Sequence, residues 1–138
     1  MNMKSMRVLI VDDLPQVRQG LKSLLQLASK KTTPVLEVVG EASDGRQALR
    51  QAQVLQPDVI LMDLEMPGLD GFEATRQIKA AQPGVRVVIL SIHAGAEEER
   101  ARQAGADDFV VKGAGYHTLL NAILNRDAEN QSFDRNGE

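Results

Sequence analysis

The sequence predicts an α/β protein in which five strands alternate with five helices. Short apolar runs, such as residues 8–11 and 87–90, are separated by longer segments in which apolar residues recur at helical spacing. The central run, residues 59–62, has no polar residue on either face, which is typical of a strand buried on both sides of a parallel sheet. These observations favour one parallel sheet with helices on both faces.

Each predicted strand is rich in valine, isoleucine or leucine and is bounded by turn residues. The strands span residues 7–11, 35–42, 59–63, 85–91 and 109–112. The central strand ends near Leu64, because Pro67-Gly68 and Asp70-Gly71 are turn sequences. The second strand alternates only loosely and carries Glu37, so we expect it near an edge of the sheet.

Apolar residues at helical spacing follow each strand and predict five amphipathic helices. Their predicted inward positions are Val17, Leu21, Leu24, Leu25 and Ala28; Ala48, Leu49, Ala52 and Leu55; Phe72, Thr75 and Ile78; Ala101 and Ala104; and Tyr116, Leu119, Leu120, Ile123 and Leu124. Pro15 opens the first helix, and Pro57 follows the second. The fourth helix, about residues 97–104, buries only alanines and gains little from burial, so we expect it to be weakly anchored.

Composition limits the classes of function. The chain has 138 residues, which suits one domain, and it has no cysteine for disulfides or thiolate metal sites. Its apolar runs are too short to cross a membrane, and no signal-peptide core is visible, so we expect a cytoplasmic protein. The formal net charge is −3 with both signs interspersed, so this segment is not expected to contact nucleic acid.

Acidic residues follow two of the predicted strands. The strand order 2-1-3-4-5 sets the carboxyl ends of the first and third strands side by side, and we choose it partly for that reason. It brings Asp12 and Asp13 against Asp63, with Ser91 and Lys112 arriving from the fourth and fifth strands. Open α/β sheets bind ligands at this edge, so these five residues form the predicted site.

The predicted cluster suits Mg²⁺ and phosphoryl chemistry. Three carboxylates repel one another unless a cation lies among them, and oxygen ligands favour a hard ion such as Mg²⁺. With part of the charge neutralised, Asp63 can attack the phosphorus of a phosphodonor and form an acyl phosphate. Lys112 supplies a positive charge, and Ser91 a hydroxyl that moves toward a phosphoryl oxygen. Phe109 can fill the space that Ser91 leaves.

Four motifs in this order resemble the response-regulator receiver domain of two-component signalling. They are Val11-Asp12-Asp13, Leu61-Met62-Asp63-Leu64-Glu65-Met66-Pro67-Gly68-Leu69-Asp70-Gly71, Leu90-Ser91, and the segment from Gly105-Ala106 to Lys112. The resemblance implies a flavodoxin-like fold of five βα units over residues 6–126, between a polar leader, residues 1–5, and a polar tail or linker, residues 127–138. It also implies a phosphorylation-controlled switch, with no enzyme activity beyond its own phosphorylation and dephosphorylation.

The resemblance assigns a role to each matching residue. Asp63 is the phosphoacceptor, Asp13 a direct metal ligand, and Asp12 a metal-site carboxylate that often acts through water. The main-chain carbonyl of Glu65 is a further metal ligand. Three residues match the switch hydroxyl, the switch aromatic and the phosphate-binding lysine of the family: Ser91, Phe109 and Lys112.

Residues 36–45 and Leu90-Ser-Ile-His93 resemble the NarL/FixJ branch, whose members usually join a receiver to a helix-turn-helix domain. The implied partners are a sensor histidine kinase, a second copy after phosphorylation, and a DNA-binding domain in a longer chain. One departure is Gly113, where the family commonly has proline. A cis peptide after Lys112 is therefore not expected, and the loop there gains freedom.

Other interpretations of the same residues remain open. Asp12 and Asp13 can favour a helix start, and Glu97-Glu98-Glu99 is most simply a solvated helix start. His93 and His117 are isolated and are interpreted as surface residues. Two rival functions are a Mg²⁺-dependent phosphohydrolase, which normally has an aspartate where this chain has Glu65, and a receiver-shaped interaction module that accepts no phosphate.

Overall fold

The computed structural model describes residues 5–66 and 68–125 of the chain. The predicted tail and most of the predicted leader lie outside these residues. The strands are β1 (Met6–Val11), β2 (Leu36–Ala42), β3 (Val59–Asp63), β4 (Arg86–Ser91) and β5 (Asp108–Val111). The helices are α1 (Pro15–Ala28), the 3-10 turn η1 (Ser29–Lys31), α2 (Gly45–Leu55), α3 (Gly71–Ala81), α4 (Ala96–Gln103) and α5 (Tyr116–Leu124).

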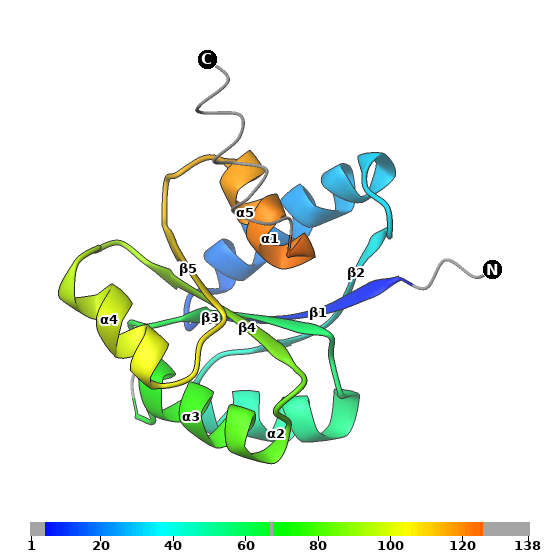
Figure 1. The fold of residues 1–138 in the computed structure, drawn as a ribbon. Helices are drawn as coiled ribbons and strands as arrows, with labels where there is room; N and C mark the ends of the chain where they lie inside the picture. The colour runs from blue at the N-terminus through cyan, green and yellow to red at the C-terminus, as the bar shows by residue number, and fades with distance from the viewer. Residues whose placement is uncertain (1–4, 67, 126–138) are drawn as a thin grey trace.

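The strands form one parallel sheet in the order β2-β1-β3-β4-β5, which confirms the predicted fold class and strand order. Helices α1 and α5 cover one face of the sheet, and α2 and α3 cover the other (Figure 1). Helix α4 lies on the same side as α3, beside β5 (Figure 1). Among the described residues, no helix is both long and apolar enough to cross a membrane.

Strand β3 lies at the centre of the sheet and is buried along its whole length. Side chains alternate between the two faces of a strand. Val59 and Leu61 accordingly pack into the core beneath α1 and α5, whereas Ile60 and Met62 pack into the core on the opposite face. Burial on both faces of the sheet thus explains why residues 59–62 include no polar residue, as the sequence predicts.

Strand β2 is an edge strand, as expected, and its irregular sequence pattern has a structural cause. Val8 of β1 pairs with Val38, but the next residue, Leu9, pairs with Gly40, so Val39 is an extra residue in a β-bulge. The bulge changes which side chains face inward after Val38. A Cβ at Gly40 would lie 2.6 Å from a methyl carbon of Leu55, so the bulged strand packs closely on α2.

Helix α4 is held by few apolar contacts. Ala101 is its one buried residue, and Ala104 is buried just beyond its end, which confirms the predicted alanine face. The guanidinium of Arg100 lies 4.1 Å from the centroid of the Phe72 ring of α3. That stacking is a cation–π contact at the surface, a weaker restraint than burial of a leucine.

Several sequence-based details need correction. Tyr116 was expected to face inward from the fifth helix, yet it is 41% exposed and stacks on His117. Phe72 faces the core as expected but is only partly buried, because its ring lies at the edge of the core beneath Arg100. The fully buried α3 side chains are Ala74, Thr75 and Ile78. Strand β5 starts and ends one residue earlier than predicted, although the Lys112 N–H still donates to the carbonyl oxygen of Ser91 at 2.7 Å.

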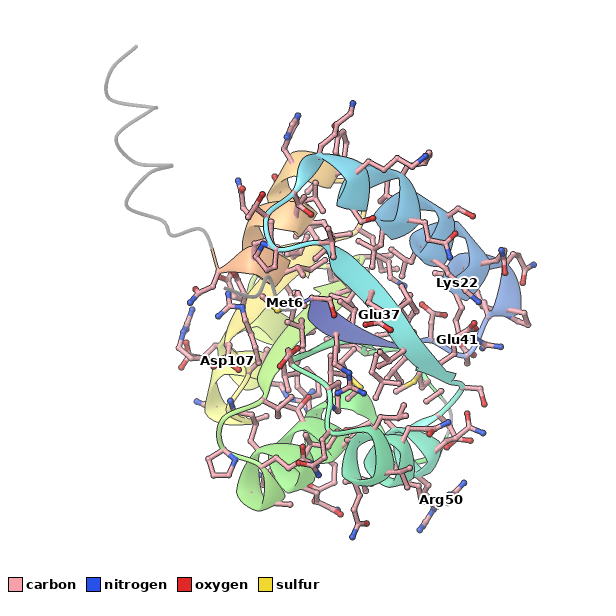
Figure 2. The ribbon with its side chains drawn as sticks, turned by 90° about the vertical axis from the view of Figure 1, so that its right-hand side faces the viewer. Met6, Lys22, Glu37, Glu41, Arg50 and Asp107 are labelled. Carbon is pink, nitrogen blue, oxygen red and sulfur yellow. The ribbon has the colours of Figure 1, made fainter. Side chains whose placement is uncertain are left out.

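Glu41 joins the edge strand to α1. Its carboxylate accepts hydrogen bonds from Arg18 at 2.9 Å and from Lys22 at 3.4 Å. Figure 2 shows Lys22 and Glu41 on neighbouring elements at one side of the sheet. The hydrogen bond from Arg18, against the opposing effect of burial, holds the pKa of Glu41 below its usual range, with Lys22 adding to the effect.

We predict that Glu41→Gln lowers the free energy of unfolding at pH 7 by up to about 1 kcal/mol, because the pair is partly exposed. Because the pKa of Glu41 is lower in the folded state than its unfolded value of 4.5, the ion pair stabilises the fold at pH values above 4.5. This stabilisation is lost as the pH falls through the pKa of the folded state. Urea unfolding at pH 7 and at pH 3 measures the difference. Glu37→Gln, on the same strand, is the control. An equal loss at both pH values would contradict the ion-pair explanation.

Candidate functional site

Three aspartates meet at the carboxyl ends of β1 and β3. Val11 pairs with Met62 in the sheet, so the residues that follow each of them lie at the same edge. One carboxylate oxygen from each of Asp12, Asp13 and Asp63 lies within 4.8 Å of the other two. The sequence-predicted acidic cluster is therefore present.

Asp12 is buried, and its two oxygens have different surroundings. Oδ1 accepts a hydrogen bond from the Leu14 N–H at 3.0 Å, which fixes the carboxylate in the turn before α1. Oδ2 is buried without a hydrogen-bond partner among the described residues. The Asp12 carbonyl oxygen accepts from Arg18 at 2.7 Å, so the backbone is also held. A buried carboxylate oxygen without a partner is costly unless a cation or donor reaches it.

Lys112 extends from the end of β5 to the same cluster. Its Nζ lies 2.7 Å from Oδ1 of Asp63 and 3.6 Å from Oδ2 of Asp12. Burial favours the neutral amine, but the hydrogen bond to Asp63 and the charges of Asp63 and Asp12 outweigh it and raise the pKa of Lys112. One ammonium thus faces two of the three carboxylates.

Asp63 lies at the end of a buried strand and is 2% exposed. Burial raises its pKa to about 6; the hydrogen bond from Lys112 opposes that rise, and the charge of Asp12 adds to it. The physical cause is desolvation of a carboxylate that has one hydrogen-bonded cation and two anionic neighbours. A further positive charge at the cluster would favour the ionised form.

Ser91 ends β4, one residue beyond Leu90, which pairs with Asp63 in the sheet. Its hydroxyl is fully buried and accepts a hydrogen bond from the His93 N–H at 3.1 Å. The hydroxyl oxygen also lies 2.5 Å from Oε1 of Glu97 at the start of α4. Sequence reasoning missed this partner, because it treated Glu97 as part of a solvated helix start.

The remaining residues singled out in the sequence differ in how far they are buried. Phe109 is partly buried on β5, beside a small hollow of about 150 Å³ between α4 and β5. Glu65 has an exposed side chain in the loop after β3, and its predicted role as a main-chain ligand stays a prediction. His93 and His117 are exposed, as expected, and His117 stacks on Tyr116.

The backbone conformation at residue 113 suits the glycine that stands where the family commonly has proline. The φ of Gly113 is +92°, a region that favours glycine and that proline, with φ near −65°, cannot adopt. The one cis peptide bond among the described residues joins Thr33 to Pro34, so the bond after Lys112 is trans, as the sequence suggests.

Gly71 allows α3 to start directly against the end of β3. A Cβ at this position would lie 2.6 Å from the carbonyl oxygen of Asp63 and 3.1 Å from Cα of Leu64. Both contacts are with backbone atoms, which cannot rotate away. The Asp70 side chain caps the same helix by accepting from the Glu73 N–H at 2.8 Å. The position of Asp63 thus depends on a small residue at the start of α3.

We predict that Gly71→Ala destabilises the protein by about 1–3 kcal/mol, because the backbone at Asp63 must shift to admit a methyl group. Chemical denaturation measures the change. Gly84→Ala is the matched control, since an added Cβ there meets no atom within 4 Å. Equal destabilisation by the two variants would show that close packing at Asp63 is not the cause.

The acidic cluster fits a hard divalent cation. Its donors are carboxylate oxygens only, and Asp12 adds a buried oxygen that has no hydrogen-bond partner among the described residues. Oxygen donors of this kind bind Mg²⁺, which usually takes one or two protein carboxylates and keeps several waters. Asp12, Asp13 and Asp63 are therefore the residues that would hold the ion.

We predict that Asp13→Asn and Asp12→Asn each weaken Mg²⁺ binding about tenfold or more, since even residues that only orient a ligand contribute that much. Isothermal titration calorimetry measures the affinity. Glu37→Gln removes the same charge from the edge strand β2 and controls for net charge. Weakening of the same size in all three variants would argue against a local site.

The fold and the site define a doubly wound α/β domain with an acidic cluster and a lysine at the carboxyl edge of its sheet. The sequence matches the response regulator receiver domain family over residues 8–124. The chain therefore belongs to the response regulator receiver domain family.

Two relatives show what kinds of protein have a similar sequence. Response regulator GacA of Pseudomonas aeruginosa is 40% identical over 121 residues, which cover 85% of this chain and 53% of that protein. A protein-glutamate methylesterase/protein-glutamine glutaminase of Alkalilimnicola ehrlichii is 47% identical over 108 residues, which cover 77% of this chain and 26% of that protein. The chain thus spans about half the length of GacA and about a quarter of the second relative.

Two solved structures have the same fold. A LuxR-family two-component response regulator from Aurantimonas has a TM-score of 0.79 at 36% identity, covering 88% of this chain and 84% of that one. The receiver domain of the response regulator NarL from Mycobacterium tuberculosis also has a TM-score of 0.79, at 32% identity, covering 88% of this chain and 95% of that one. These neighbours support the NarL/FixJ branch that the sequence predicts.

Proposed function

We propose that this domain is a phosphorylation-dependent switch in which Asp63 accepts a phosphoryl group from a sensor histidine kinase. The observation that carries the proposal is the position of Asp63 within 4.8 Å of two further carboxylates and 2.7 Å from the ammonium of Lys112. Both kinds of neighbour favour uptake of a phosphoryl group by the carboxylate. A cation bound by the further carboxylates reduces the repulsion between Asp63 and the phosphoryl oxygens, and the ammonium neutralises charge on those oxygens.

The chemical step is a transfer of the phosphoryl group from an oxygen or nitrogen atom of the donor to a carboxylate oxygen. A carboxylate oxygen of Asp63 attacks the phosphorus of the donor, a P–O bond forms, and the bond from phosphorus to the leaving atom of the donor breaks with its electron pair. Attack of water on the same phosphorus later returns the carboxylate and releases inorganic phosphate. The two steps consume the phosphodonor and one water molecule and need no oxidant or reductant.

The surrounding residues would stabilise the charge that passes through the site. Asp12, Asp13, Asp63 and the main-chain carbonyl of Glu65 would hold Mg²⁺, which would supply positive charge to the phosphoryl oxygens. Lys112 would exchange its bond to Asp63 for one to a phosphoryl oxygen, because an ammonium group binds either anion. Burial of Asp63 keeps bulk water from screening these interactions.

A change at Ser91 would carry the signal outward. Its hydroxyl is proposed to move toward the phosphoryl group, and Phe109 to move into the space beside it. Ser91 contacts the start of α4, Phe109 packs into the core on the α4 side of the sheet, and α4 is held by few apolar contacts. The face formed by α4, β5 and α5 would therefore change its shape.

We predict that a small phosphodonor such as acetyl phosphate, with Mg²⁺, adds one acid-stable, base-labile phosphoryl group, and that Asp63→Asn abolishes it. The side-chain amide of this variant cannot act as the nucleophile, whereas the fold should persist because the two side chains are nearly the same size. Mass spectrometry of the intact protein measures the label, and Asp70→Asn is the control. A label that persists without the Asp63 carboxylate would refute the site.

A second prediction concerns the response of the fold. Phosphorylation should change amide hydrogen exchange mainly in α4, β5 and the loop after Ser91, because these elements have few buried contacts. Hydrogen exchange followed by mass spectrometry, with and without phosphodonor, measures it. A response confined to α2 would contradict the roles of Ser91 and Phe109.

Partners and output follow the same reasoning. We propose a cytoplasmic domain whose output is control of transcription where a DNA-binding domain is joined to it, and which can pair with a second copy after phosphorylation. The names of GacA and of the LuxR-family regulator support a regulatory output. The match to the methylesterase covers 26% of that protein and does not by itself support esterase activity in this domain.

The two rival functions have weaker support. A phosphohydrolase normally uses an acid–base carboxylate two residues after its nucleophile, and the Glu65 side chain at that position is exposed. A receiver-shaped module that accepts no phosphate could use the Lys112 bond to Asp63 to neutralise a buried charge, but that role does not require the third carboxylate, Asp13, at the same edge. Steady release of phosphate from many small phosphate esters would favour the first rival, and failure to acquire a label would favour the second.

A further inference from the structure

The hydroxyl of Ser91 already has a partner on α4. It accepts from the His93 N–H at 3.1 Å, and it lies 2.5 Å from a carboxylate oxygen of Glu97. An ionised carboxylate only accepts hydrogen bonds, and a serine hydroxyl has one proton to donate. The Ser91 proton is therefore directed at Glu97 in this structure.

That single proton cannot serve two acceptors at once. The proposed switch requires Ser91 to donate to a phosphoryl oxygen on Asp63, and the same proton now binds Glu97. The two hydrogen bonds therefore compete, so phosphorylation must break the bond between Ser91 and Glu97. Ser91 is fully buried, so each of the two competing hydrogen bonds is stronger than it would be in water.

The position of Glu97 links this competition to α4. Glu97 lies in the first turn of α4. Ala101 is the one residue of this helix that is buried in the core. Glu98 and Glu99, next to Glu97, instead pair with Arg102 on the exposed face of the helix. Of these three acidic residues, Glu97 is the one that connects the start of α4 to the end of β4.

We propose that Glu97 is a positioning residue that holds Ser91 and the start of α4 in the unphosphorylated arrangement and is released when Ser91 binds the phosphoryl group. This inference rests on the proposed function of Asp63. It goes beyond that function, because it names the residue that opposes the switch and the contact through which phosphorylation affects α4.

The test measures binding of beryllofluoride with Mg²⁺, a non-covalent mimic of the phosphoryl group, by calorimetry on the whole chain. Glu97→Ala removes the competing acceptor and should tighten binding about tenfold, in keeping with the loss of one hydrogen bond to a charged group. Glu98→Ala removes the same charge from the same turn without touching Ser91, and its affinity should match that of the unmodified protein.

A double variant separates the hydrogen bond from simple charge. In the Ser91→Ala background, Glu97→Ala should leave the affinity unchanged, because no hydroxyl remains to be released. A tenfold gain that persists in this background, or an equal gain in Glu98→Ala, would overturn the proposal in favour of long-range repulsion of the anion.

Amide hydrogen exchange without any phosphoryl mimic gives a readout that does not depend on the proposed function. Glu97→Ala should speed exchange in the first turn of α4 several-fold more than Glu98→Ala does, and equal rates would overturn the proposal. Failure of the unmodified protein to bind beryllofluoride would reject the function of Asp63, whereas normal binding without a gain in Glu97→Ala would reject the role of Glu97.

Discussion

The structure depends on the burial of carboxylates at the end of a hydrophobic sheet. Asp12 and Asp63 are almost fully buried, and one ammonium, that of Lys112, lies within reach of both. Buried charges of one sign are unfavourable unless a partner neutralises them. The carboxyl edge of the sheet therefore favours the binding of a further positive charge. The buried apolar residues of β3 hold Asp63 in place at this edge.

The helices that cover the sheet are anchored unequally. The face beneath α1 and α5 is packed with leucine and isoleucine side chains, such as Leu25, Leu119 and Ile123. Helix α4, on the other face, contributes one buried alanine. Burial of apolar area sets how much it costs to move an element. Polar contacts, including the one between Glu97 and Ser91, thus carry a larger share of the restraint on α4 than on α1 or α5.

The sequence predicted the fold and most of the site because both follow from short, regular patterns. Alternating strands and helices implied the parallel sheet, and the residues after β1, β3, β4 and β5 then had to meet at one edge. The β-bulge at Val39 was hidden, since an extra residue only blurs the alternation of β2. The partner of Ser91 was also hidden, because Glu97 lies beyond a loop whose path has no signal in residue spacing.

The alanine-lined contact of α4 has a consequence for substitutions on the outer surface of this helix. A helix that buries only Ala101 has few positions fixed by the core, and apart from Glu97 and Arg100, which contact Ser91 and Phe72, its outer positions can change without disturbing the sheet edge. Substitutions at those outer positions should therefore change the surface that α4 presents more than they change the stability of the fold.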